Sequence, residues 1–363
     1  MMKLLQTMLN KARPSFHDNG KLRGLQPVFD ATENFFFAPE SNTRAAPHIR
    51  DPLDIKRFMS MVIIALMPSV AAAFYFFGPR LLAMIAVSYA AGGAVETLFA
   101  VVRKEEINEG FLVTGLIFPL ILPPALPLWM VAVGVAFGVL VGKELFGGTG
   151  RNLFNPALVG RCFLALGYPS MMAGNWISPG SGPLGRLVQY VDASSVDAIS
   201  SATPLGAAKQ GVMAPVPDLL WGSVSGSPGE TCAIAIIAGG LFLVITRVIN
   251  WRTVAGILGS FALLGAVLRH VDPSTFAPVG WQLLAGGLLF GAFFMATDPV
   301  TSPVTNGGKW AYAVLIGVAT LLIRALTGYV EGVMFAILLA NIAAPAFDEV
   351  AVHFRLRRLQ HER

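Results

Sequence analysis

Long apolar runs, separated by short polar connections and by one long polar segment at 169–230, occupy the chain from residue 58 onward. A helix needs about 20 predominantly apolar residues to cross a bilayer, and run length separates such helices from strands. Ten runs are long enough to span or half-span: 58–77, 81–102, 111–122, 128–146, 155–168, 231–249, 254–271, 282–297, 309–327 and 332–351. The pattern predicts an all-α, polytopic membrane protein with about ten transmembrane helices.

The third run of each group of five is short or interrupted. The run 111–122 ends in a cluster of four prolines, and the run 282–297 ends in Thr297-Asp298-Pro299 with a further proline at 303. Proline removes a backbone donor and ends a helix. Such segments at matching places predict broken helices that meet near the midplane and whose freed carbonyls could line an ion or solute path. An ordinary short helix followed by a loop is the alternative.

The two groups of five also resemble each other in sequence. At one constant offset, Trp129 aligns with Trp310, Lys143 with Arg324, Gly147 with Gly328, Phe154 with Phe335 and Leu158 with Leu339. Because each group has an odd number of spans, the second group would be inverted relative to the first. We therefore expect two inverted five-helix repeats, as in many transporters.

These runs predict five parts. They are a basic amino-terminal arm (1–57), a first membrane repeat (58–168), an outward-facing loop (169–230), a second membrane repeat (231–351) and a basic tail (352–363). If the arm lies inside, 20 of the 26 Lys and Arg residues lie inside as well. The positive-inside rule therefore places both termini in the cytoplasm.

Composition agrees with this class of protein and excludes others. Hydrophobic residues make up 55% of the chain and charged residues 13%, whereas soluble domains carry about 25% charge. The net charge of +5 follows from membrane topology and does not indicate a nucleic-acid partner. Cys162 and Cys232 form no CxxC pattern, so we expect small buried side chains and no metal or iron–sulfur site.

Three acidic residues fall in or beside the apolar runs, namely Glu96, Asp298 and Asp348. A carboxylate in hydrocarbon is costly unless paired or wet, so each is a candidate for a cation path. Solvated acids at span ends are the alternative, above all for Asp348. Asn152 and Asn155 open the fifth run after a glycine-rich stretch, and their spacing of three would place both on one face of a starting helix. They suit either the polar edge of a planar heterocycle or, by spacing alone, ordinary helix capping.

The central loop carries a cluster of small hydroxyl residues with nearby acids. Residues 197–203 read Asp-Ala-Ile-Ser-Ser-Ala-Thr, without His, Cys or a paired catalytic carboxylate. From the residues alone this is a turn or a hydroxyl cluster accessible to modification.

The same stretch resembles the Asp-x-x-Ser/Thr-Gly-Ala-Thr signature at which a flavin transferase attaches FMN to threonine. Further motifs lie at Asn-Glu-Gly-Phe 108–111, Leu-Pro-Pro 122–124, Phe-Gly-Gly-Thr-Gly-Arg-Asn 146–152, Asn-Pro-Ala-Leu 155–158 and Met-Ala-Thr-Asp-Pro-Val 295–300. Together, over about residues 48–352, they resemble the family of the B subunits of Na⁺-translocating NADH:quinone oxidoreductases, to which the D subunits of Rnf ferredoxin:NAD⁺ oxidoreductases are related.

The resemblance implies roles for particular residues. It gives Thr203 a covalent FMN, within a signature that includes Asp197, Ser200 and Ala202, and Asn152 and Asn155 a non-covalent riboflavin. It places ubiquinone or menaquinone at Gly92 and Gly93 and a sodium path at Glu96, Asp298 and Asp348.

The resemblance also implies a setting in the bacterial inner membrane. The partners would be an NADH-binding flavin and iron–sulfur subunit, a second FMN subunit, and the flavin transferase. The chain itself carries no dinucleotide-binding glycine motif.

Departures from the family pattern are the Ser at 201, the Ala at 198 and the short connection at 78–80. An Rnf-type subunit and a flavin-free channel of the urea or ammonium kind are the alternatives.

Overall fold

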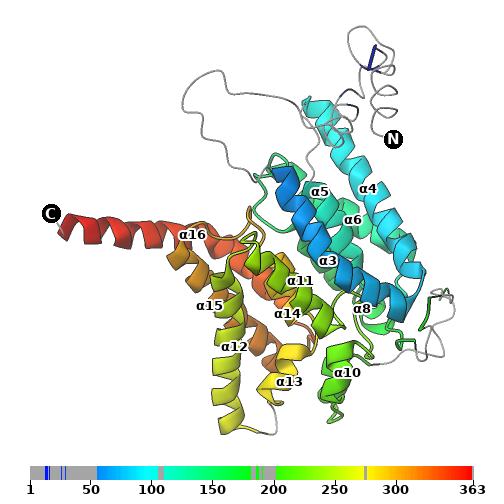
Figure 1. Cartoon of the computed structure of the whole chain (residues 1–363), viewed down its shortest axis with the longest axis vertical. Helices are drawn as coiled ribbons and strands as arrows, with labels where there is room; N and C mark the ends of the chain where they lie inside the picture. Colours follow the sequence, from blue (N-terminus) through cyan, green and yellow to red (C-terminus); the bar gives the residue numbers. More distant parts are fainter. Residues whose placement is uncertain are drawn as a thin grey trace.

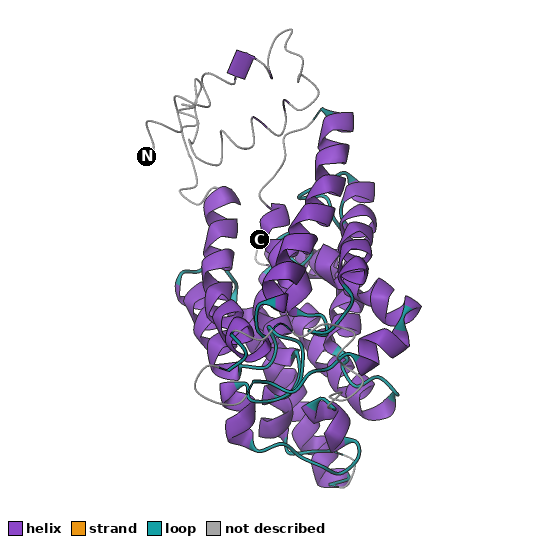
Figure 2. Cartoon of the chain, turned by 90° about the vertical axis from the view of Figure 1, so that its right-hand side faces the viewer, coloured by secondary structure: helices purple, strands orange, loops and turns teal. Residues whose placement is uncertain are grey.

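The fold is described from a computed structural model of the chain, which covers residues 55–104, 110–180, 185–187, 190, 202–273 and 276–361 with a few isolated residues before them. The regular elements within these residues are helices, arranged as two groups that lie side by side (Figures 1 and 2). Nearly all of the predicted arm, together with Asp197 and Ser200, lies outside the described residues.

The first group contains five helices that reproduce the first five predicted runs. Their bounds are α3 Ile55–Phe77, α4 Arg80–Arg103, α5 Gly110–Leu120, α6 Leu128–Gly142 and α7 Pro156–Gly167, with a short helix η2 at Glu144–Phe146. Helix α5 ends one residue after Pro119, as the proline cluster predicts.

Short helices connect the groups: α8 Pro169–Gly174, α9 Pro204–Ala208 and α10 Val216–Trp221. The second group contains α11 Ala233–Ile245, α12 Trp251–Val271, α15 Asn306–Leu326 and α16 Val333–His361. The predicted run 282–297 is divided into α13 Val279–Leu284, α14 Leu288–Phe290 and the π-helix η4 Gly291–Met295. The run is interrupted as expected, but at residues 285–287, where Gly286 has a positive φ of 71°, and not at the prolines from which the break was predicted. Helix α16 continues about ten residues beyond its predicted end and projects sideways from the bundle (Figure 1).

Six of the described helices are long and apolar enough to cross a membrane, and α5, α7 and α11 are shorter apolar helices. Large apolar side chains remain exposed on the outer faces of the helices, among them Ile245 (77%), Leu263 (71%) and Val271 (76%). Since a soluble protein rarely exposes such contiguous apolar surface, these faces suit contact with lipid. The chain is a polytopic helical membrane protein.

One continuous apolar core joins the two groups through α3, α5, α11, η4 and α16. Helix α3 packs on α11 so closely that a Cβ at Gly239 would collide with the carbonyl oxygen of Ala65. Glycine permits this backbone approach. The close contact fixes the position of the two groups relative to each other.

Each helix break is stabilised by a buried arginine. Arg80 donates to the carbonyl oxygens of Pro124 (3.0 Å) and Leu126 (2.9 Å), beyond the end of α5. Arg324 donates to those of Gln282 (2.9 Å) and Ala285 (3.1 Å), at the end of α13. Each of these four carbonyls thereby has a hydrogen-bond partner within the protein. The ion or solute path along freed carbonyls stays a prediction.

Candidate functional site

A cavity of about 720 Å³, which we call the Thr203 cavity, lies among α7, the connecting segment 202–231 and the start of α16. Its walls include Trp176 and Phe335 on the apolar side and Arg161, Thr203 and Glu230 on the polar side. Ligand pockets of small molecules and cofactors are commonly 300–1,000 Å³ and combine apolar walls with a few polar groups. The cavity therefore has the size and lining of a cofactor site.

Thr203 lies at the edge of this cavity, at the N-cap of α9. Its Oγ accepts the backbone N–H of Gly206 at 3.2 Å, and its carbonyl accepts that of Ala207 at 2.8 Å. The following Pro204 and Leu205 are buried, and Leu205 packs in a small apolar cluster with Trp281. Buried neighbours on one side hold the hydroxyl at the cavity wall, where a modifying group could reach it.

Two ion pairs lie at the polar side of the Thr203 cavity, which Arg161, Glu230 and Glu331 line directly. Arg161 of α7 bonds to Glu230 at 3.0 Å, and Arg324 of α15 bonds to Glu331 at 2.8 Å. Glu331 also accepts the backbone N–H of Gly287 at 2.9 Å. The pairs thus connect the first group, the loop between the groups and the interrupted helix of the second group. Removal of one member of such a pair leaves the other charge buried without its counter-charge.

Lys209 adds a cation at the rim of the cavity. Its Nζ donates to the carbonyl oxygens of Thr327 and Tyr329, both at 2.9 Å, and ties α9 to the end of α15. Partial desolvation lowers the pKa of Lys209 from its ordinary value. The side chain is exposed, so this contact adds little to stability.

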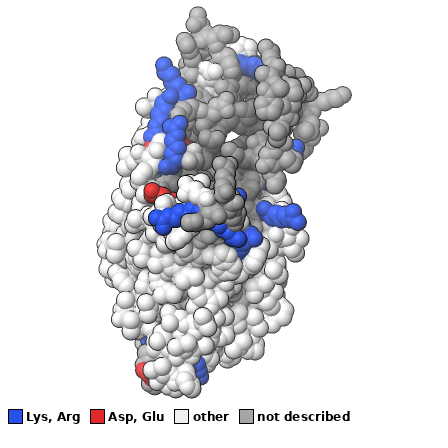
Figure 3. Space-filling view, turned by 90° about the vertical axis from the view of Figure 1, so that its left-hand side faces the viewer, with Lys and Arg blue, Asp and Glu red and all other residues white. Residues whose placement is uncertain are grey.

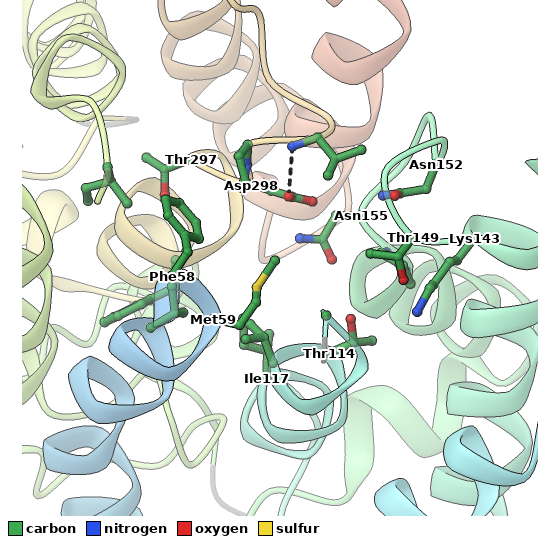
Figure 4. Close-up of a pocket in the computed structure, with 18 of the residues that line it drawn as sticks. Phe58, Met59, Thr114, Ile117, Lys143, Thr149, Asn152, Asn155, Thr297 and Asp298 are labelled. Carbon is green, nitrogen blue, oxygen red and sulfur yellow. Dashed lines mark hydrogen bonds between the residues drawn. The ribbon is translucent and has the colours of Figure 1, made fainter. Parts of the chain in front are cut away.

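A second, smaller pocket lies at the other end of α7, and we call it the Asp298 pocket. Its volume is about 70 Å³. Lys143, Thr149 and Asn152 line one side, Phe58 and Thr297 line the other, and Asp298 and Asn155 lie between them (Figure 4). Helix α7 runs from this pocket to the Thr203 cavity, so the two spaces lie at opposite ends of one helix.

The structure brings Asn152 and Asn155 together in the Asp298 pocket, but not on one helix face. Asn155 is the N-cap of α7, and its Oδ1 accepts the N–H groups of Ala157 (3.1 Å) and Leu158 (3.4 Å). Asn152 lies in the preceding loop and donates to the carbonyl oxygen of Phe154 at 3.1 Å. The capping interpretation is therefore confirmed for Asn155. The shared helix face is wrong, because α7 begins only at Pro156.

Asp298 lies on the wall of the same pocket, directly after the interrupted helix. Its carboxylate accepts the N–H of Val300 at 3.2 Å (Figure 4) and the hydroxyl of Thr301, also at 3.2 Å. These contacts leave the carboxylate oxygens room for additional partners. The cation path at Asp298 stays a prediction.

Glu96 has a buried cationic partner. Lys143, at the end of α6, reaches the carboxylate with an Nζ–Oε1 distance of 2.6 Å. Lys143 also lines the Asp298 pocket, so Glu96 lies one side chain away from it.

Gly92, Gly93 and Asp348 line neither of the two spaces described above. A Cβ at Gly92 would lie 2.6 Å from the Phe111 ring, whereas one at Gly93 would lie 3.4 Å from it. The first glycine thus accommodates the packing of α5 on α4. Asp348 accepts the N–H groups of Val304 and Thr305, each at 2.8 Å, and the Thr305 hydroxyl. It thereby anchors the segment that begins α15.

Three residues of these sites were not singled out by sequence reasoning as functional: Lys143, Arg161 and Glu230. The sequence indicates Lys143 only through its alignment with Arg324 and as one of the inner positive charges, and Arg161 only as one of the six remaining positive charges. The signal that could have identified Lys143 and Arg161 is their place in the sequence, because each lies within a run of apolar residues. In that setting a charged residue needs a buried partner.

The two spaces differ in how well they fit the expected flavins. The Thr203 cavity fits an FMN attached at its wall, because it offers the volume, an aromatic side chain and a guanidinium with donors to spare. The Asp298 pocket has the amide and hydroxyl groups for a heterocycle's edge. A space of about 70 Å³, however, has room for only a few water molecules and is too small for riboflavin.

Taken together, the fold and these spaces define a polytopic membrane protein with a cofactor-sized cavity and a polar pocket at opposite ends of one short helix. The particular family follows from comparison with known proteins: the chain belongs to the NQR2, RnfD, RnfE family, which matches residues 42–356. It is 36% identical to the B subunit of the Na(+)-translocating NADH-quinone reductase of Ectopseudomonas mendocina and 37% identical to that of Azotobacter vinelandii. Each match covers 98% of both chains.

Proposed function

We propose that this chain is the membrane-embedded B subunit of a bacterial Na⁺-translocating NADH:quinone reductase. The observation that carries the proposal is the match over 98% of both chains to subunits of that name. An isolated motif can arise by chance, but a match of this extent includes every helix described above. The chain then works with partner subunits, one of which binds NADH.

The Thr203 cavity is the proposed site of a covalent FMN. The group would be attached to Thr203 Oγ through its phosphate, with Trp176 and Arg161 on the surrounding walls. Bound flavin supplies one- and two-electron redox chemistry, and the protein supplies position and charge. Arg161 is suited to this task because it bonds Glu230 and, among the residues that the structure describes, no other partner. Its remaining donors can therefore interact with a ligand.

Riboflavin and quinone are assigned on resemblance alone. For riboflavin we propose the Asp298 pocket with Asn152 and Asn155, on the condition that the pocket widens from its present volume. For the quinone we propose the region of Gly92 and Gly93 on α4, next to Phe111. Glu96, Asp298 and Asp348 are the proposed acids of the sodium path.

The proposed topology is two inverted repeats of five helices, with both termini in the cytoplasm. Equivalent helices pack alike, because α4 contacts α6 and α6 contacts α7, as α12 contacts α15 and α15 contacts α16. The aligned cations Lys143 and Arg324 lie at different spaces, one at the Asp298 pocket and the other beside Gly286 on the wall of the Thr203 cavity. Equivalent residues of two inverted repeats lie toward opposite sides of the membrane, and these two cations lie at the two spaces at opposite ends of α7.

The distribution of surface charge supports a membrane band. On the face shown in Figure 3, Lys and Arg gather around one end, and a broad uncharged surface separates them from the few charges at the other end. The first end is the proposed cytoplasmic side.

The function is tested in membrane vesicles from cells with and without this chain, supplied with NADH and a quinone. The proposal expects quinone reduction that Na⁺ stimulates and that disappears with the chain. Activity that needs reduced ferredoxin instead of NADH would assign the chain to an Rnf-type complex. Solute flux independent of both donors would assign a channel.

A further inference from the structure

The buried pair of Lys143 and Glu96 joins the end of α6 to the middle of α4. The ammonium lies 2.6 Å from the carboxylate, and the two side chains are only 4% and 6% exposed. Neither charge has access to bulk water, so each depends on the other. Lys143 also lies on the wall of the Asp298 pocket (Figure 4), so its side chain connects that pocket to Glu96.

The pair leaves Glu96 incompletely bonded. Oε1 accepts from Lys143, whereas Oε2 is buried and contacts no hydrogen-bond donor among the described residues. The hydroxyl of Thr149, on the pocket wall beside Lys143, is likewise buried without a described partner. An ionised carboxylate can accept several bonds, and native proteins rarely bury an oxygen without one. These two oxygens without hydrogen bonds therefore indicate that a small ligand can bind here, either in place of the Lys143 ammonium or beside it.

The next ion pair along the chain shows which part can move. Arg103 bonds to the Glu144 carboxylate at 2.8 Å and also donates to the Glu144 carbonyl oxygen. The backbone after Lys143 is thus fastened to the end of α4 by a planar guanidinium. Lys143 has a flexible four-carbon stem and a compact ammonium. Its side chain can turn while its backbone stays in place.

We propose that Lys143 is a tethered cation that closes a monovalent cation site at Glu96, and that Na⁺ binds Glu96 when Lys143 turns toward the Asp298 pocket. The identity of the ion rests on the proposed function. Sodium is a hard cation and takes oxygen ligands, which the carboxylate supplies. One positive charge replaces another, so the buried carboxylate is neutralised in both states.

The pocket supplies the second position that the exchange needs. Asp298 and Asn152 line it together with Lys143 and provide a carboxylate and an amide oxygen. An ammonium that leaves Glu96 can be satisfied there without reaching bulk water. Any ligand of the pocket that gains negative charge would draw Lys143 toward it and free Glu96 for a cation. The occupancy of the cation site would thereby depend on the charge state of the pocket.

The test uses the full chain within its purified complex and measures the melting temperature in NaCl and in choline chloride of equal ionic strength. Lys143→Gln removes the tethered cation and leaves Glu96 unpaired. We expect its melting temperature to rise at least twice as much as that of the wild type when Na⁺ replaces choline. The rise should saturate with concentration. Lys143→Arg keeps the charge and should respond like the wild type.

The double variant Glu96→Gln/Lys143→Gln removes the proposed site and should lose the additional Na⁺ response. A response of Lys143→Gln equal to that of the wild type, or one that persists in the double variant, overturns the proposal. If Lys143→Gln folds only in NaCl while the double variant folds in both salts, the proposal is supported. If Lys143→Gln folds in neither salt while the double variant folds, Na⁺ does not replace the ammonium and the proposal fails.

The same preparations separate this inference from the proposed function. Covalent flavin on the denatured chain reports on Thr203 and does not depend on Lys143. A flavin-bearing wild type without the expected Na⁺ responses would overturn the cation site alone. A wild type without covalent flavin would contradict the proposed FMN site instead.

Discussion

Arg161 and Glu230 form a buried ion pair, 3.0 Å apart, between a helix of the first group and the loop that leads into the second. Each side chain is less than one-tenth exposed. The pair lies on the wall of the Thr203 cavity, so it serves both as a connection between the two groups and as the charged face of the proposed flavin site.

The two members of this pair should behave very differently when they are removed singly or together. Arg161→Gln should lower the free energy of unfolding by about 3–5 kcal/mol, because Glu230 would remain buried without its counter-charge. Arg161→Gln/Glu230→Gln should recover much of that loss, since neutral side chains can bond each other. Thermal unfolding of the purified protein in detergent measures both effects. A double variant less stable than Arg161→Gln would show that Glu230 has another stabilising partner.

The contact between the two groups can be tested at a single glycine. Gly239→Ala should destabilise the protein by about 1–3 kcal/mol or more, because the new methyl group would overlap the carbonyl oxygen of Ala65. Gly259→Ala is the matched control. It lies within α12, its Cβ would meet nothing within 4 Å, and helix propensity predicts a gain of up to about 1 kcal/mol. Equal melting temperatures for the two variants would contradict the close packing of α3 on α11.

Gly92 and Gly93 provide a second matched pair, now for the proposed quinone region. Gly92→Ala should displace the Phe111 ring, which lies 2.6 Å from the new carbon, whereas Gly93→Ala meets the same ring at ordinary contact distance, 3.4 Å. We expect a loss of stability of about 1–3 kcal/mol for the first and little change for the second. The Michaelis constant for quinone, measured on both, separates the roles. An increase in Gly93→Ala at unchanged stability would support quinone binding here, and an unchanged constant in both would oppose it.

Asp348 has a structural role that can be distinguished from a role in the ion path. Asp348→Asn and Thr305→Val both disrupt the contact that anchors the start of α15. If anchoring is the main role, both variants should lose about 1–2 kcal/mol of stability, with the Na⁺ concentration for half-maximal activity unchanged. A several-fold shift of that concentration in Asp348→Asn but not in Thr305→Val would instead support a role for Asp348 in the sodium path.

The sequence predicted the helices well because each is marked by a continuous apolar run. Nine of the ten predicted runs correspond to single helices within the part of the chain that the structure describes, and the tenth is the one in which an interruption was expected. Helix α16 was predicted too short because its last turns, such as Phe354 to Arg358, are exposed and carry charge. The apolar run ends before these turns, but their residues still favour a helix, so the helix continues beyond the run.

The site was predicted only in part, because its pairings join residues far apart in the chain. Asn155 as a cap follows from the adjacent proline and is a local feature. The partnership of Lys143 with Glu96 depends instead on how α4 packs against α6, and that of Arg161 with Glu230 on how the central loop returns to α7. No local pattern encodes either distance. The same holds for Arg80 and Arg324, which reach the carbonyls at the two helix breaks from distant positions in the chain.

The proposed redox role depends most on the attachment of a flavin at Thr203. The direct measurement is the ultraviolet fluorescence of the chain in a denaturing gel, after expression together with its flavin transferase. We expect a fluorescent band for the wild type and none for Thr203→Ala. Ser225→Ala, which changes another hydroxyl residue of the same cavity, should keep the band. Fluorescence that persists in Thr203→Ala, or is absent from the wild type, would contradict the assignment.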